Sequence, residues 1–278
     1  MVLIGTAGFS YRDWEGVFYP AGVKDAEMLG FYARLFPCVE LDFTYYRMPS
    51  VRTMEGLARK VPEGFEFCVK AFKGMTHELK GQSGEPGAGG GGDVDSVFRA
   101  FVEAIKPMVS RGSLGCVLAQ FPWGFKRTRE NLDYVRRLKD RLKDLSVVVE
   151  FRNREWVRPD TFELLRLEGL GFCCVDEPRL RGLVPPVAEV TSDIAYVRFH
   201  GRNAEKWWNH DQAWERYNYL YSEAELAEWV PKINALDARA AKTYVLFNNC
   251  HAGQAAENAR MLQNMMKLGF EGSGGKDG

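Results

Sequence analysis

Residues 147–152 read Val147-Val148-Val149-Glu150-Phe151-Arg152, an apolar run that ends in two charged residues spaced two apart. Because side chains two apart on a strand share a face, Glu150 and Arg152 point the same way at the end of the run. Similar apolar runs with polar ends occur at residues 39–42, 195–200 and 244–248. In an α/β barrel, the carboxyl ends of the strands form the mouth where ligands bind. The pattern therefore predicts a barrel whose mouth carries charges of both signs.

Eight strand-like segments alternate with amphipathic helical patterns along the chain. The predicted strands are Leu3–Thr6, Val39–Asp42, Phe65–Lys70, Cys116–Gln120, Val147–Phe151, Phe172–Asp176, Ala195–His200 and Thr243–Asn248. The predicted helices cover residues 25–36, 50–60, 94–109, 128–142, 159–168, a segment after the capping box of Ser222 and Glu225, and 254–268. Parallel strands need such crossover helices. The order predicts an α/β fold with a single (β/α)8 TIM barrel, a closed parallel sheet with outer helices, over residues 1–270.

A few segments depart from this regular alternation. Residues 177–193 contain three prolines and predict an irregular connection between two strands. Pro231 is expected to kink or shorten the helix that begins after Ser222. The glycine-rich residues 83–93 predict a flexible loop, and residues 271–278 predict a disordered tail.

The overall charge argues against one class of protein. Lysine plus arginine and aspartate plus glutamate both number 37, so the formal net charge is zero. A protein held to nucleic acid mainly by neutralising phosphates needs a basic surface, although a local basic patch remains compatible with this balance. No run approaches the roughly 18 apolar residues of a membrane span, and the chain opens with a strand rather than a signal peptide. We expect a cytoplasmic protein with no membrane partner.

The six cysteines contain no C-x-x-C pair. Five of them lie in or beside predicted strands: Cys38, Cys68, Cys116, Cys173 and Cys174. A free thiol in such a place behaves as a small buried hydrophobic group, so we expect reduced core cysteines rather than disulfides or a zinc cluster. Cys250 follows the last predicted strand and is expected near the mouth.

Five residues at strand ends are the predicted catalytic groups: His200, Glu150, Glu40, Asp42 and Lys70. His200 can transfer protons near neutral pH. Glu40 and Asp42 are nearby carboxylates, which raises one of their pKa values and suits acid or base work. A partly desolvated Lys70 can bind an anion or act as a base. The structural alternative is that these charges form buried ion pairs that only close the top of the barrel.

Ligand binding is assigned first to arginines, because a guanidinium binds phosphate or carboxylate through two hydrogen bonds. The predicted loop at residues 206–221 is rich in aromatic and basic residues, which can stack on a sugar or base and can also fold down as a hydrophobic lid. A second wall is expected at residues 6–14. The predicted ligand-binding residues are Thr6, Tyr11, Trp14, Tyr45, Gln120, Arg152, Asp176, Arg198, Arg202, Tyr217, Tyr219 and Asn248.

No metal or other cofactor is predicted, but one metal site stays open as an alternative. Glu150, Asp176 and His200 end three successive predicted strands and offer oxygen and nitrogen ligands for a divalent ion. Two neighbouring arginines, Arg152 and Arg198, would compete with a cation for the carboxylates. The chain has only four histidines, which makes a cluster of several zinc ions implausible.

Several motifs occur in a fixed order: IGTAGFSYRDW at residues 4–14, FYP at 18–20, VELDFTYYR at 39–47, FCVK at 67–70 with Thr76-His77, QFP at 120–122, EFRNREW at 150–156, RFHGR at 198–202, YNY at 217–219 and FNN at 247–249. This order resembles the YecE-like family, a domain-of-unknown-function family (number 72) with TIM-barrel architecture. The resemblance covers about residues 2–268. The chain departs from the family pattern at Asp42, where Asn is frequent, at Phe9, where Trp is frequent, and at Cys250-His251, where an acidic residue is usual.

The resemblance implies the fold and the location of the pocket, but it supplies no reaction. Members of the family have been likened in structure to sugar isomerases and to abasic-site endonuclease barrels, which implies a sugar or a DNA ligand. Likeness of fold alone does not fix function.

Three functions follow from these residues. The leading hypothesis is an enzyme of hydrolase or isomerase type that binds a small anionic, polyhydroxylated ligand, such as a sugar phosphate or nucleotide, at the C-terminal mouth of the barrel. No dinucleotide fingerprint is visible, which disfavours redox chemistry. The second hypothesis is a DNA- or RNA-binding protein related in fold to abasic-site endonucleases, and the third is a non-catalytic binding scaffold.

Overall fold

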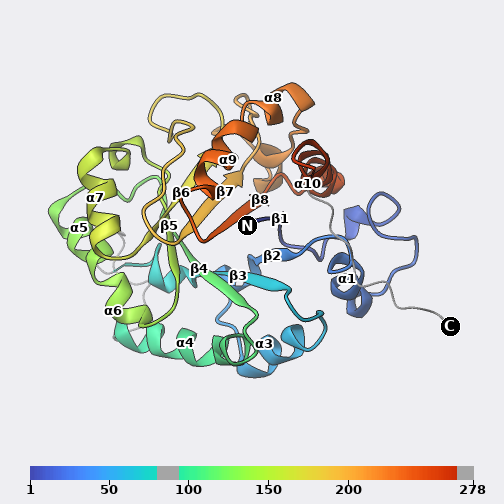
Figure 1. Ribbon diagram of the computed structural model, residues 1–278, viewed down its shortest axis with the longest axis horizontal. Helices are drawn as coiled ribbons and strands as arrows, with labels where there is room; N and C mark the ends of the chain where they lie inside the picture. Colours follow the sequence, from blue (N-terminus) through green and yellow to red (C-terminus); the bar gives the residue numbers. More distant parts are fainter. Residues whose placement is uncertain (80–93, 268–278) are drawn as a thin grey trace.

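The computed structural model describes residues 1–79 and 94–267. Eight parallel strands form a closed barrel in which each strand pairs with its neighbours in chain order and β8 pairs with β1. Helices surround the strands (Figure 1). The predicted TIM barrel is therefore confirmed. The loop predicted at residues 83–93 and the tail predicted at 271–278 lie outside the described residues.

The strands are β1 Val2–Ala7, β2 Cys38–Leu41, β3 Glu66–Lys70, β4 Leu114–Gln120, β5 Val147–Glu150, β6 Gly171–Asp176, β7 Ile194–Phe199 and β8 Lys242–Phe247. The helices are α1 Asp25–Tyr32, α2 Phe43–Tyr46, α3 Val51–Ala58, α4 Val94–Ser110, α5 Arg129–Arg136, α6 Leu138–Leu142, α7 Pro159–Leu167, α8 Glu223–Ala227, α9 Val230–Asp237 and α10 Gln254–Met265. Short 3-10 turns lie at Arg12–Trp14, Lys73–Met75, Arg154–Trp156, Ala213–Tyr217 and His251–Gly253. In the described ranges, no helix combines the length and apolar character needed to cross a membrane.

Prolines shape the connections on both sides of β7. Residues 177–193, all of which are described, form neither helix nor strand between β6 and β7, as their prolines predict. Pro231 lies in the first turn of α9, where its missing N–H breaks no helical hydrogen bond. The helix expected after Ser222 is therefore divided into α8 and α9.

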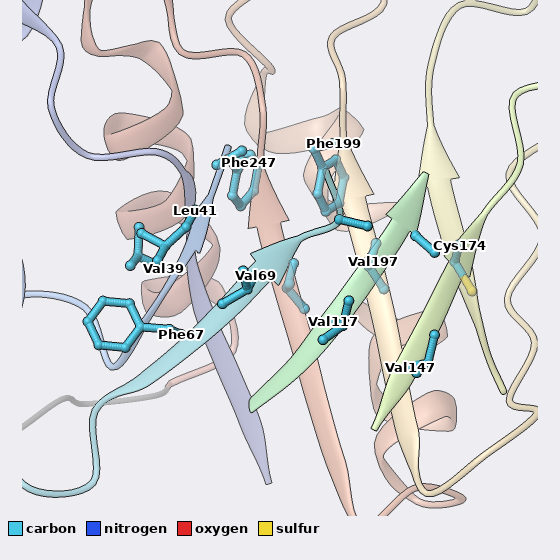
Figure 2. Packing of buried hydrophobic residues seen from close by; sticks show 14 of the residues in the cluster. Val39, Leu41, Phe67, Val69, Val117, Val147, Cys174, Val197, Phe199 and Phe247 are labelled. Atoms are coloured by element: carbon cyan, nitrogen blue, oxygen red, sulfur yellow. The ribbon is translucent and has the colours of Figure 1, made fainter. Parts of the chain in front are cut away.

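Strand side chains alternate between two apolar layers. The outer layer packs against the helices, and Figure 2 shows part of it, with the rings of Phe199 and Phe247 stacked at a centroid distance of 4.6 Å. The inner layer fills the barrel and consists largely of small or medium side chains, including Cys38, Cys68, Cys116, Leu118, Val148 and Cys173. All six cysteines are buried and free, which confirms the prediction of reduced core thiols.

Gly5 in β1 provides a test of how tightly the barrel is packed. A Cβ at this position would collide with the backbone carbonyl oxygen of Cys38 on the neighbouring strand β2, and a paired strand cannot move away freely. We predict that Gly5→Ala lowers the free energy of unfolding by about 1–3 kcal/mol or more. Denaturant unfolding would measure this change.

Gly56 is the matched control, because it lies on the exposed side of α3 with no atom near the position of a Cβ. Gly56→Ala should raise the stability by about 0.5–1 kcal/mol through helix propensity. Equal effects of the two substitutions would contradict the close approach at Gly5.

Candidate functional site

The floor of the barrel mouth is a buried ion network centred on Arg198 of β7. Its Nη1 donates a hydrogen bond to Oε2 of Glu150 at 2.7 Å, and its Nη2 donates to Oε1 of Glu40 at 2.5 Å. The hydroxyl of Tyr196 donates to the second oxygen of Glu40 at 2.7 Å. All four side chains are fully buried. Pairing of this kind is what allows charges to remain inside a protein.

Glu150 connects Arg198 to a second arginine and to a histidine. Its Oε1 lies 2.5 Å from Nε of Arg152 and 3.1 Å from Nε2 of His200. Arg152 in turn reaches Oε2 of Glu177 with Nη1 at 3.4 Å. The six residues that form this floor network are Glu40, Glu150, Arg152, Glu177, Arg198 and His200.

His200 has no free ring nitrogen. Its Nε2 faces Glu150, and its Nδ1 lies 3.0 Å from Nδ2 of Asn248. Burial and the nearby Arg152 hold the pKa of His200 well below its usual value. A neutral ring that accepts from the Asn248 amide at Nδ1 and donates from Nε2 to Glu150 satisfies both contacts. His200 therefore positions Glu150 and Asn248.

The carboxyl groups of the floor network ionise at different pH values. Burial raises the pKa of Glu40 to about 8, with Arg198 opposing this shift and Asp42 adding to it. Burial likewise raises the pKa of Glu177 to about 7 against the influence of Arg152. At Glu150 burial acts in the same direction, but Arg198 and Arg152 outweigh it and hold the pKa well below the usual range. Glu150 is thus the anion of the network, and Glu40 holds a proton at neutral pH.

A cavity of about 320 Å³ opens above the floor, and we call it the cationic pocket. Three cationic side chains line it, Lys70, Arg152 and Arg216, and no carboxylate from residues 1–79 or 94–267 does. The Nζ of Lys70 lies 4.9 Å from the ring centroid of Tyr45. The remaining lining is mostly aromatic or apolar: Tyr45, Tyr46, His77, Gln120, Pro122, Trp123, Leu183, Trp207, Trp208, Ala213 and Tyr217.

A second cavity, of about 620 Å³, lies beside the first, and we call it the Trp214 pocket. Tyr46, Ala213 and Tyr217 line both cavities, so the two are compartments of one mouth. The other residues of the Trp214 pocket are Tyr11, Asp13, Asp42, Trp214, Asn248, Cys250 and His251.

Lys70 and Asp42 connect the two compartments. Lys70 lines the cationic pocket, Asp42 lines the Trp214 pocket, and Lys70 Nζ lies 3.9 Å from Oδ1 of Asp42. The same oxygen lies 3.8 Å from Nη2 of Arg198 and accepts no hydrogen bond from the described part of the chain. Asp42 is therefore the carboxylate that joins the floor network to a cavity.

The structure brings most of the predicted site residues together. Nine of the predicted catalytic and ligand-binding residues lie in the floor network or line a cavity: Glu40, Asp42, Lys70, Gln120, Glu150, Arg152, Arg198, His200 and Asn248. Tyr11, Tyr45 and Tyr217 also line a cavity. Cys250 lines the Trp214 pocket, as its place in the sequence predicted.

The prediction that Asp176 and Thr6 face the mouth is wrong. Val175 packs inside the barrel, so the alternation of side chains turns Asp176 outward to the helix layer. There it binds Arg202 through both oxygens, at 2.8 and 2.9 Å, and accepts from Nε1 of Trp229 at 2.7 Å. Thr6 likewise faces α1 and contacts the hydroxyl of Tyr32 at 2.9 Å.

Three other predicted ligand-binding residues are committed elsewhere. Arg202 is paired with Asp176 and with Glu228 of the α8–α9 region, at 2.9 Å from the latter. The hydroxyl of Tyr219 donates to Glu225 at 2.5 Å. Trp14 is fully buried and donates from Nε1 to the carbonyl oxygen of Cys250 at 2.6 Å. These side chains support the walls of the mouth from behind.

The alternative metal site at Glu150, Asp176 and His200 is also wrong. Asp176 faces the helices, whereas Glu150 and His200 face the barrel interior and contact each other. Within residues 1–79 and 94–267, no group of three or more histidine, cysteine, aspartate or glutamate side chains is arranged to hold a metal ion.

Several site residues were not in the predicted set. Glu177 lies in the floor network and is reached by counting two residues on from the inward Val175. His77 lines the cationic pocket, and burial together with Lys70 lowers its pKa to about 4. Arg216 and Trp214 come from the aromatic and basic loop, whose composition indicated a wall without indicating which of its side chains face inward.

Comparison with known proteins gives consistent matches over nearly the whole chain. The family described as "Protein of unknown function DUF72" matches residues 3–276. The UPF0759 protein YunF of Bacillus subtilis is 33% identical over 282 residues, which cover 98% of this chain and 97% of that protein.

Solved structures agree with this relationship. The crystal structure of a DUF72 family protein from Thermotoga maritima is 42% identical, with a TM-score of 0.86 over 96% of this chain and 99% of that one. A DUF72 family protein from Enterococcus faecalis is 29% identical, with a TM-score of 0.83 over 97% of each chain.

Removal of Arg198 tests the floor network. Arg198→Met leaves Glu40 and Glu150 buried without their cation, so we predict a loss of about 3–5 kcal/mol in the free energy of unfolding. Denaturant unfolding measures it. The control is Arg59→Met, which removes only an exposed ion pair with Glu55 on α3 and should change stability by less than about 0.5 kcal/mol. A small effect at Arg198 would mean that the network is not needed for folding.

The raised pKa of Glu40 predicts a pH dependence of stability. Between pH 4.5 and about 8 the folded protein keeps a proton on Glu40 that the unfolded chain has lost. The stabilisation from this group is therefore fully present below pH 4.5 and is lost as the pH rises through about 8. Relative to Glu40→Gln, the wild type should lose stability on the order of 1 kcal/mol per pH unit in this window. Unfolding curves at pH 5, 6.5 and 8 measure the difference, and parallel pH profiles would contradict the assignment.

Proposed function

The chain belongs to the DUF72 family of proteins of unknown function, and we propose from the geometry of its mouth that it is an enzyme acting on a small anionic, polyhydroxylated ligand. A sugar phosphate or a nucleotide is a ligand of this kind, and hydrolysis or isomerisation is the class of reaction. The observation that carries the proposal is the cationic pocket, whose lining in the described part of the chain includes three cations and no carboxylate.

One of these cations has a donor that makes no hydrogen bond in the described part of the chain, the buried Nε atom of Arg216. The Nε of Arg152 lies 2.5 Å from Oε1 of Glu150, and this ion pair holds the second guanidinium in place. The guanidinium of Arg216 is held against the rings of Trp207 and Tyr217, at 6.0 and 5.8 Å from their centroids. Guanidinium groups held in place in this way suit a phosphate or carboxylate.

The walls of the cationic pocket favour an anion that carries an organic body. Six aromatic side chains line a cavity of about 320 Å³: Tyr45, Tyr46, Trp123, Trp207, Trp208 and Tyr217. Ligand sites of this size, apolar with a few polar groups, are typical for small molecules. Aromatic faces pack against sugar or base rings, whereas a bare inorganic ion gains nothing from them.

The contacts divide the chemical work between two sets of residues. Asp42 and Lys70 touch the cavities, so we assign them direct roles: Asp42 moves a proton, and Lys70 holds the anion. Glu40 lies behind Asp42 and stores a proton near neutral pH. Glu150 and His200 have their polar atoms committed to one another and to the arginines, which supports a positioning role.

The two other hypotheses predict different behaviour. A nucleic-acid function is favoured by the exposed rings at the mouth, Tyr46, Trp123, Trp208 and Trp214, on which bases can stack. Asp13 and Asp42 lie among these rings and would repel a phosphate backbone, so we place this function second. A non-catalytic scaffold would bind the ligand without converting it to a product.

The proposal is tested by binding and by turnover. Calorimetry should detect binding of inorganic phosphate to the wild-type protein. Arg216→Met should reduce this affinity about tenfold or more, because a charge-assisted hydrogen bond contributes about 1.5–3 kcal/mol. Lys106→Met, which removes an exposed cation paired with Glu103 far from the mouth residues in sequence, is the control and should have no effect.

A panel of sugar phosphates and nucleotides then tests turnover. Asp42→Asn should retain phosphate binding and lose about a hundredfold or more in rate. Turnover that is unchanged in this variant would refute the role of Asp42. Binding without any turnover would favour the scaffold, and tighter, salt-dependent binding of a single-stranded oligonucleotide would favour the nucleic-acid function.

A further inference from the structure

The Trp214 pocket has the opposite polarity to the cationic pocket beside it. Asp13 and Asp42 line it, and among the described residues no lysine or arginine does. Trp214 is 47% exposed at this cavity, and its ring stacks on His251 with a centroid distance of 4.3 Å and an angle of 16° between the planes. The stack fixes the orientation of an indole that solvent still reaches.

Three of the hydrogen-bond donors around this pocket are directed at atoms of the protein itself. The hydroxyl of Tyr11 donates to the carbonyl oxygen of Ala7 at 2.7 Å, and Sγ of Cys250 donates to the same oxygen at 2.9 Å. The amide nitrogen of Asn248 is directed at His200. The pocket presents two carboxylates to a ligand, Asp42 and Asp13, and Oδ2 of Asp13 accepts from the backbone N–H of Ala252 at 2.6 Å.

The Asp42 carboxylate is the acceptor that most lacks a partner. Its Oδ1 is buried and receives no hydrogen bond from residues 1–79 or 94–267. The nearest cationic atoms lie beyond hydrogen-bond distance of Oδ1, with Nη2 of Arg198 at 3.8 Å and Nζ of Lys70 at 3.9 Å. A ligand group that donates a hydrogen bond beside this carboxylate is therefore favourable.

We propose that the Trp214 pocket is a sugar subsite, which binds the hydroxyl-bearing ring of a ligand whose anionic group lies in the cationic pocket. This inference rests on the proposed function. Each hydroxyl can rotate to donate, so a sugar can satisfy several acceptors at once. A nucleobase carries fixed acceptors beside its donors, and some of these would face the carboxylates. The indole of Trp214 supplies a flat apolar surface for the C–H face of the sugar.

The shared wall determines how such a ligand lies. Tyr46, Ala213 and Tyr217 border both compartments, and the Lys70–Asp42 pair spans them. The anionic group then meets Lys70, and the nearest ring hydroxyls meet Asp42. This arrangement places the bonds between the ring and the anionic group beside the residue to which we assign proton transfer.

The experiment compares three probes by calorimetry: inorganic phosphate, glucose 6-phosphate and phenyl phosphate, whose ring has no hydroxyls. In the wild type, glucose 6-phosphate should bind at least tenfold more tightly than inorganic phosphate and more tightly than phenyl phosphate. Trp214→Ala and Asp13→Asn should each remove most of the difference in affinity between glucose 6-phosphate and inorganic phosphate. In both variants, the affinity for inorganic phosphate should stay within about twofold of the wild-type value. Leu220→Ala, an exposed apolar residue in the same connection that lines neither cavity, is the control and should change nothing.

The outcomes separate the two proposals. If inorganic phosphate binds and glucose 6-phosphate gains nothing, or keeps its gain in Trp214→Ala, the sugar subsite is refuted and the cationic pocket stands. If phenyl phosphate exceeds inorganic phosphate in affinity by as much as glucose 6-phosphate does, the pocket binds a ring without needing its hydroxyls, and the sugar assignment is refuted. If inorganic phosphate does not bind but glucose 6-phosphate binds in a Trp214-dependent way, the subsite stands and the anion site falls. If neither binds, both fall.

Discussion

The guanidinium of Arg198 has no contact with solvent, and this single fact constrains the whole mouth of the barrel. A cation in that position needs an anion and further hydrogen-bond acceptors around it. Glu150 of β5 is the anion, and Glu40 of β2 accepts a second hydrogen bond. Three strands that are not adjacent in the sheet are thereby tied together across the barrel interior. The mouth consequently has a solid, hydrogen-bonded floor, and ligands have access only to what stands above it.

The floor also determines which groups remain available for chemistry. Glu150 contacts His200 and the two arginines, and the second ring nitrogen of His200 contacts Asn248. A histidine at the end of a barrel strand is nevertheless the residue that usually attracts a catalytic assignment. Asp42 and Lys70 stand one step outward and keep an unsatisfied oxygen and a partly exposed ammonium. In the function that we propose, the groups that meet the ligand are therefore the charges just above the most buried ones.

The floor could be predicted from the sequence, because strand alternation is a local rule. Arg198 and His200 share a face by spacing, as do Glu150 and Arg152, and the structure brings all four together. The same rule gives the wrong face for Asp176 when the alternation is started from this last polar residue of the strand. Started from Val175, which packs inside the barrel, it turns Asp176 outward. The walls could not be predicted in this way. Trp214 faces its cavity because it stacks on His251, 37 residues away in the chain, and no local pattern encodes such a contact.

The connection between β7 and α8 borders both compartments, whereas the strands beneath it carry the charge network. Under the function that we propose, the wall that this connection contributes lies outside the buried ion network, and Arg152 belongs to both the network and the cationic pocket. Over evolutionary time, substitutions in this one connection can change ligand preference at little risk to folding, while the floor tolerates few changes. Relatives that share the strand-end charges but differ between residues 201 and 222 are therefore expected to share a framework and to have diverged in their substrates.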